Sequence, residues 1–150
     1  MKLAEALQER ADLNRKIAQL RSRLEMNATV QEGETTAEDP EELMKELNEC
    51  IERLETLIVR INLTNCVTKV NGKSLTELIA RRDCLTLKAA AYRSLLDQAS
   101  SITQRLSISE IKILRAVDVK AIQKEADALS RELRQMDNTI QQANWQTELN

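Results

Sequence analysis

The sequence predicts a mainly α-helical protein in which long helical hairpins form a domain like a four-helix bundle, with a minor β-hairpin or small sheet. Two observations carry this prediction. Glycine occurs twice and proline once in 150 residues, although turns and strand-rich folds depend on both residue types. Apolar residues also recur at helical spacing over long segments. Few breaking residues imply few, long elements, and the length fits one domain over 1–150.

The first helix is expected over about residues 2–28. Its apolar stripe has the three-and-four spacing of one helix face and includes Leu13, Ile17 and Leu20. Arg10 and Asn14 fall on or beside this stripe. A polar side chain there could fix the register of a helix pair, or both residues could lie at the edge with their polar ends in water.

A second helix is expected over 40–65, after a polar loop. Asp39 can cap its free amides, and Pro40 fits the first helical position. The helix carries a broad apolar face made of Leu43, Leu47, Cys50, Ile51, Leu54, Leu57, Ile58 and Ile61. The segment 29–65 is strongly acidic, whereas 1–28 and 66–101 carry a basic excess. The natural complement of this acidic helix is a basic neighbour in the same chain or in another copy.

The segment after Cys66 predicts a small sheet. Asn71-Gly72 favours a tight turn between strands over 67–70 and 72–74. Ser74 and Glu77 then form a capping box that begins a third helix over 75–101. The segment 110–116 alternates apolar and charged residues, which favours a third strand; the alternative is a short helix capped by Ser107 or Ser109.

A fourth helix is expected over 119–143, with Asp118 as its cap. It carries the clearest heptad pattern of the chain, in which the apolar seam comprises Ile122, Ala126, Leu129, Leu133, Met136, Ile140 and Ala143.

The composition argues against most enzyme classes. The chain has no histidine, which removes the commonest general base and the imidazole ligands of most metal sites. Glu42, Glu46 and Glu49 form a row on one solvated helix face and not a converging cage, so we predict no catalytic residue, metal or cofactor. Cys50 is expected to be a core thiol and Cys84 a surface thiol.

The same reasoning excludes several partners. Acidic residues interleave with the cations of the first helix, and aromatic residues for stacking are nearly absent, which disfavours nucleic acid. No apolar run is long enough to span a bilayer, and the first residues lack the pattern of a signal peptide. We therefore expect a cytoplasmic protein that does not bind membranes.

One polar set could bind a small molecule. Asn62 and Asn65 stand at the end of the second helix, Arg82 and Asp83 on the third and Asn144 at the end of the fourth. An arginine on an apolar face must be paired or open to water. The set therefore predicts either a structural network or a pocket for a polar or anionic ligand, with Arg82 as its anchor.

Several segments together resemble the septicolysin-like family, which comprises small bacterial helical proteins of unknown function. The segments are Arg23-Leu24, Asn27-Ala28, Asp39-Pro40, Ile61-Asn62, Arg82-Asp83, Ser109-Glu110-Ile111-Lys112, Ile140-Gln141 and Asn144-Trp145. The resemblance carries no established activity, so it assigns no residue a role. The label implies a cytolysin, which would need an export route and a membrane-active segment that the residues do not show.

The leading prediction is a non-enzymatic, self-associating helical protein, a homo-oligomer. Its long helices can be buried only in part by a monomer of this size, which leaves an apolar stripe for another copy. The alternative is a small-ligand binder or enzyme that uses the polar set.

Overall fold

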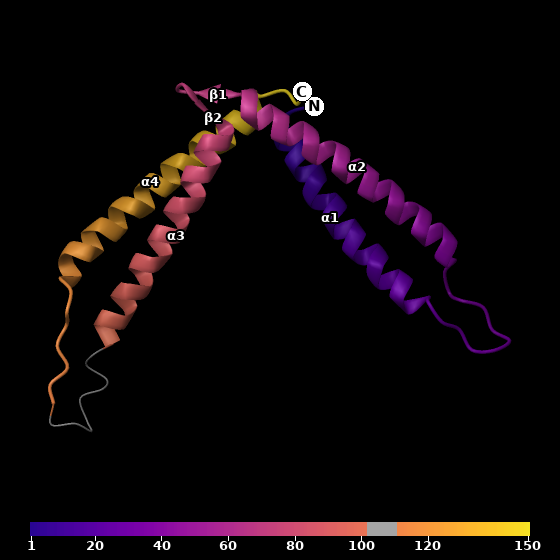
Figure 1. Ribbon diagram of the computed structural model, residues 1–150, viewed down its shortest axis with the longest axis horizontal. Coiled ribbons are helices and arrows are strands. Elements are labelled where there is room, and N and C mark those ends of the chain that lie inside the picture. The colour runs from indigo at the N-terminus through magenta and orange to yellow at the C-terminus, as the bar shows by residue number, and fades with distance from the viewer. Residues whose placement is uncertain (102–110) are drawn as a thin grey trace. The chain divides into compact units, whose positions relative to one another are not determined.

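The computed structural model of the protein describes residues 1–101 and 111–150 (Figure 1). Its elements, in chain order, are α1 (Leu3–Met26), α2 (Pro40–Val67), β1 (Lys69–Val70), β2 (Lys73–Ser74), α3 (Leu75–Ser100) and α4 (Val119–Gln146). The helices pack as hairpins, α1 with α2 and α3 with α4. The predicted fold class, mainly α-helical with a small sheet, is confirmed.

Contacts within the chain gather into two compact units. The first comprises Met1–Val70 together with Ala143–Asn150, and the second comprises Asn71–Gln142. The first contains the α1–α2 hairpin and the second contains α3 with most of α4. That residues 1–150 form a single domain stays a prediction.

Local signals in the sequence fix where α1 ends and α2 begins. The side-chain amide of Asn27 donates to the carbonyl oxygen of Arg23 (2.9 Å), and its Oδ1 accepts from the backbone amide of Glu38 (3.0 Å). Asp39 accepts from the backbone amide of Glu41 (2.9 Å), and Pro40 occupies the first helical position. The buried Asn27 thus closes α1 and holds the loop, and Asp39 caps α2 as the sequence predicts.

Apolar side chains hold α1 against α2. Leu20, Leu43 and Cys50 form a buried cluster. The half-buried residues packed around it are Leu13, Ile17, Leu24 and Leu47. The prediction that Cys50 is a core thiol is confirmed, and the cluster matches the apolar stripes expected on the two helices.

The turn between β1 and β2 has the predicted residues in the predicted conformation. Asn71 and Gly72 both have positive φ (50° and 83°), which a tight turn of this type requires. The amide of Glu77 donates to Oγ of Ser74 (3.2 Å), while the amide of Ser74 donates to Oε2 of Glu77 (2.7 Å), so the capping box forms. β1 is shorter than predicted because α2 continues to Val67, and β2 begins at Lys73 because Gly72 belongs to the turn.

The second unit is held by a seam between α3 and α4. Leu85 and Ala89 of α3 pack against Leu129 of α4, with Tyr92 and Leu133 beside them. Nη2 of Arg81 also pairs with Oε1 of Glu132 at 2.7 Å. Leu129 and Leu133 belong to the heptad predicted for the fourth helix, and here that heptad packs on α3.

The strand predicted over 110–116 is wrong for residues 111–116, which form neither strand nor helix. Residue 110 lies outside the described residues, as do Ser107 and Ser109, the caps of the alternative helix. Alternation gives a strand only where a neighbouring strand accepts its hydrogen bonds, and β1 and β2 pair with each other over two residues each. Ile111 and Leu114 are 80% and 79% exposed, so the alternation has no buried side.

None of the helices within residues 1–101 and 111–150 is long and apolar enough to cross a membrane.

Two leucines of α2 test this description of the core. Leu57 is fully buried, whereas Leu63 is 58% exposed on the same helix. We expect Leu57→Ala to lower the free energy of unfolding by about 2–5 kcal/mol, because it removes buried methyl groups and leaves a cavity. Leu63→Ala should change it by less than about 0.5 kcal/mol. Urea denaturation of both variants measures the difference, and equal effects would contradict the packing.

Candidate interaction surface

The five residues of the predicted polar set belong to two different units. Asn62 is exposed, Asn65 is half-buried and Asn144 is buried, all three in the unit that contains Met1–Val70 and Ala143–Asn150. No hydrogen bond joins the side chains of these three described asparagines. Arg82 and Asp83 lie in the other unit. A common pocket of the five therefore stays a prediction.

Arg82 finds its partners within its own unit. Its Nε and Nη2 donate to Oδ1 of the adjacent Asp83 (3.0 and 2.8 Å). Its Nε also lies 3.9 Å from Oδ1 of Asp137 on α4. The guanidinium is thus neutralised by two carboxylates, a pairing that a buried or half-buried arginine requires. The sequence identified Arg82 and Asp83 but not Asp137, which is close only because α3 packs on α4.

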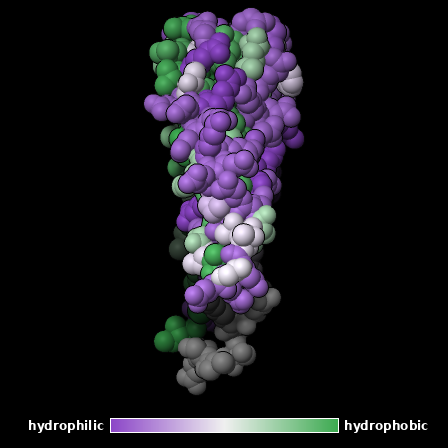
Figure 2. All heavy atoms as spheres, turned by 90° about the vertical axis from the view of Figure 1, so that its right-hand side faces the viewer, coloured by the Kyte–Doolittle hydropathy of each residue, from purple (hydrophilic) through white to green (hydrophobic). Residues whose placement is uncertain are grey.

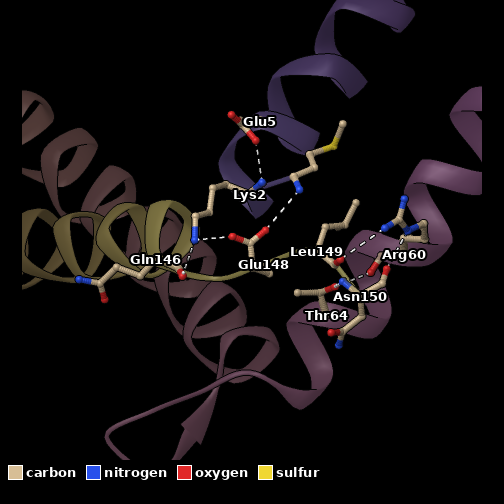
Figure 3. A network of polar contacts seen from close by, with 9 residues as sticks. Lys2, Glu5, Arg60, Thr64, Gln146, Glu148, Leu149 and Asn150 are labelled. Atoms are coloured by element: carbon tan, nitrogen blue, oxygen red, sulfur yellow. Dashed lines mark hydrogen bonds and ion pairs between the residues drawn. The ribbon is translucent and has the colours of Figure 1, made fainter.

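The end of α2 that carries the asparagines holds the C-terminal segment (Figure 3). Nε of Arg60 donates to the carbonyl oxygen of Asn150 (2.7 Å), and Nη2 to that of Leu149 (3.3 Å). The buried hydroxyl oxygen of Thr64 accepts from the amide of Asn150 (3.0 Å). The sequence analysis did not predict this contact of Thr64, because contacts with backbone leave no pattern in side chains.

The N-terminal residues join the same network. The amide of Leu149 donates to the carbonyl oxygen of Met1, and the amide of Leu3 to that of Thr147 (2.9 Å each). Nζ of Lys2 pairs with Glu148 at 2.6 Å, and the α-amino group of Met1 lies 3.2 Å from the same carboxylate. Hydrogen bonds from these two cations lower the pKa of Glu148 below its usual range. The network is structural: it ties both chain ends to α2.

One side of the α1–α2 seam is closed by ion pairs. Glu9 accepts from Arg53 (2.6 Å), and Lys16 pairs with Glu46 (2.7 Å). Arg23, a further seven residues along α1, pairs with Glu38. Hydrogen bonds from these cations lower the pKa of each of the three carboxyl groups. The seven-residue spacing places all three α1 members on one face.

The other side of the seam carries no ion pair between α1 and α2, and its α2 row is apolar. In both helices, the residues that form the ion pairs come one position before a residue of the inner stripe. The residues that come one position after a residue of the inner stripe lie on the opposite side of the hairpin. We call this second side the open face. Its apolar residues are Ala4, Leu7, Ala11 and Ala18 of α1 and Met44, Ile51 and Ile58 of α2. Asn14 and Arg21 of α1 lie on the same side, next to Ala18.

The α2 row of the open face is exposed to an unusual degree for large aliphatic residues. Met44, Ile51 and Ile58 are 48%, 45% and 37% exposed, although each directly follows a buried residue of the same helix. Ala11 and Ala18 are also exposed. Figure 2 shows one side of the molecule, which is mainly hydrophilic. An apolar row of this length on a helix usually marks a contact with another element.

The described residues bring together no metal site, and the predicted polar set does not line the apolar hollow at the end of α3. Within residues 1–101 and 111–150, no group of three acidic or cysteine side chains is placed to hold a metal ion. A hollow of about 240 Å³ at the end of α3 is lined by Leu95, Gln98, Ala99, Ser101, Ile113, Arg115, Ala116 and Val117. None of the five predicted residues lines it, and Nε of Arg115 donates to the carbonyl oxygen of Ala99 (3.0 Å).

Comparisons with known proteins agree on the fold and leave the activity open. Residues 10–149 match the family described as "Family of unknown function (DUF6847)". The crystal structure of a functionally unknown conserved protein from Corynebacterium diphtheriae superimposes with a TM-score of 0.95 at 43% sequence identity, covering 100% of this chain and 99% of that one. No curated protein matches the chain. Neither matching description mentions septicolysin or cytolysis.

The ion pairs beside the seam predict acid sensitivity. Because the folded-state pKa values of Glu9 and Glu46 are depressed, their ionised forms stabilise the fold above the ordinary glutamate range, and this contribution disappears as pH falls through the folded pKa. We expect Lys16→Met to lose less stability than the wild type between neutral pH and about pH 3. Urea midpoints across that range test this expectation. Parallel curves would mean that the exposed pair contributes nothing.

Proposed function

The chain belongs to the DUF6847 family, whose function is unknown, and from that premise we propose that it is a non-enzymatic helical interaction protein that associates with a second copy of itself. The row Met44, Ile51 and Ile58 carries the proposal. Its seven-residue spacing is the spacing of a helix contact, whereas α1 covers the neighbouring rows of α2, one of which contains Leu43, Cys50 and Leu57.

The width of the apolar face of α2 supports a second neighbour. Taken with Leu47 and Leu54, the exposed row gives α2 three apolar positions in each seven residues. A two-helix seam uses two such positions, whereas a helix that contacts two neighbours in a bundle uses three. The α1–α2 hairpin is therefore one half of a four-helix arrangement.

The size of the open face fits a second hairpin of the same kind. α1 has 24 residues, so the face is about 36 Å long and about 20 Å wide, which offers on the order of 700 Å². Stable interfaces bury about 800 Å² on each partner. A second copy presents a face of the same length and chemistry, as a two-fold symmetric contact requires.

Alternative functions have less support. For Arg82 to anchor a ligand, it would have to break its ion pairs with the carboxylates of Asp83 and Asp137. The cytolytic activity implied by the septicolysin-like resemblance has no supporting contact or surface in the described residues. We therefore carry neither activity into the proposal.

Sedimentation velocity at micromolar concentrations tests self-association. We expect the wild type to contain a dimer that dissociates on dilution. Ile51→Glu should weaken the dimer by more than about 100-fold, because burying an unpaired carboxylate costs several kcal/mol. Leu63→Glu is the matched control, since Leu63 is exposed on α2 away from the open face, and it should dimerise like the wild type. A wild type that stays monomeric contradicts the proposal.

A further inference from the structure

The register of the α1–α2 hairpin matches small residues of α1 with large residues of α2. The pair Glu9–Arg53 and the pair Lys16–Glu46 show which residues lie at the same height. Ala11 comes two residues after Glu9 on α1, and Ile51 comes two residues before Arg53 on α2. Because the helices are antiparallel, Ala11 is level with Ile51. The same antiparallel step makes Ala18 level with Met44 and Ala4 level with Ile58. Each of these three levels of the open face thus carries one alanine and one large side chain.

From this pattern we propose how the second copy docks: α1 of each copy packs on α2 of its partner, with the α1–α2 loops of both copies at the same end. This inference rests on the self-association proposed above. A two-fold axis parallel to the helices preserves the levels. It therefore sets each alanine against the Ile or Met of the partner at its own level, and large and small side chains alternate around the bundle.

The other symmetric arrangement packs less well. A two-fold axis perpendicular to the helices places α2 on the partner's α2 and α1 on the partner's α1. Ile51 then meets Ile51 of the partner subunit, while Ala11 meets Ala11 of the partner subunit. Large side chains crowd one half of such an interface and alanines leave voids in the other half, and both defects are unfavourable.

Charge favours the same arrangement. α1 has a net positive charge, and α2 has a net negative charge. On α2, Glu41, Glu52 and Glu55 are exposed and form no ion pair with any described residue. Packing α1 on the partner's α2 places opposite charges side by side, whereas packing α2 on α2 would bring two acidic helices together.

Thiol cross-linking distinguishes the two arrangements. In a Cys66→Ser, Cys84→Ser background, which removes the two exposed thiols, one sample carries Ala11→Cys and a second carries Ile51→Cys. We expect a short thiol cross-linker to join subunits in the mixture of the two samples and in neither sample alone. The Ala18→Cys and Met44→Cys variants repeat the test at a second level. Cross-linking within either single sample, with none in the mixture, overturns the arrangement.

Sedimentation of the same samples separates this inference from the proposed function. Monomers contradict self-association itself, whereas dimers without the mixed cross-link overturn the arrangement alone.

Discussion

The structure depends on a mismatch in α2 between the apolar surface that this helix carries and the apolar surface that α1 can cover. Its seven-residue repeat has three apolar positions, and one neighbouring helix covers two of them. The buried position is occupied by Leu43, Cys50 and Leu57, and the uncovered one by Met44, Ile51 and Ile58. The interaction that we propose follows from this surplus, because an exposed aliphatic row gains free energy when another element covers it.

The ion pairs of the hairpin determine which side remains available. Glu9–Arg53, Lys16–Glu46 and Arg23–Glu38 recur on one side of the seam. Each pair lies at the surface, exposed or half-buried, and contributes little stability alone. Together they set the register of α1 against α2 and give that side a charged, hydrated surface. The same register places the alanines of α1 level with the large side chains of α2, so one set of local contacts defines both sides of the hairpin.

The sequence was informative where structure follows from local signals. The caps at Asp39 and Ser74 and the turn at Asn71-Gly72 act within a few residues, and they were placed correctly. The strand prediction failed for residues 111–116 because a strand depends on a distant neighbour that periodicity does not reveal. For the polar set, the sequence identified Arg82 and Asp83 but could not see Asp137. It also could not foresee that Arg60 and Thr64 bind backbone of the C-terminal segment.

Native mass spectrometry of gently purified protein tests the central claim most directly, because one spectrum reports both the number of subunits and any retained small molecule. If the open face is covered by a second copy, the spectrum contains a dimer of bare subunits at micromolar concentration. A monomer over the same concentrations, or a subunit that retains a small molecule, would contradict the account. A retained small molecule would make Arg82 and the asparagines near the ends of α2 and α4 the candidate binding site.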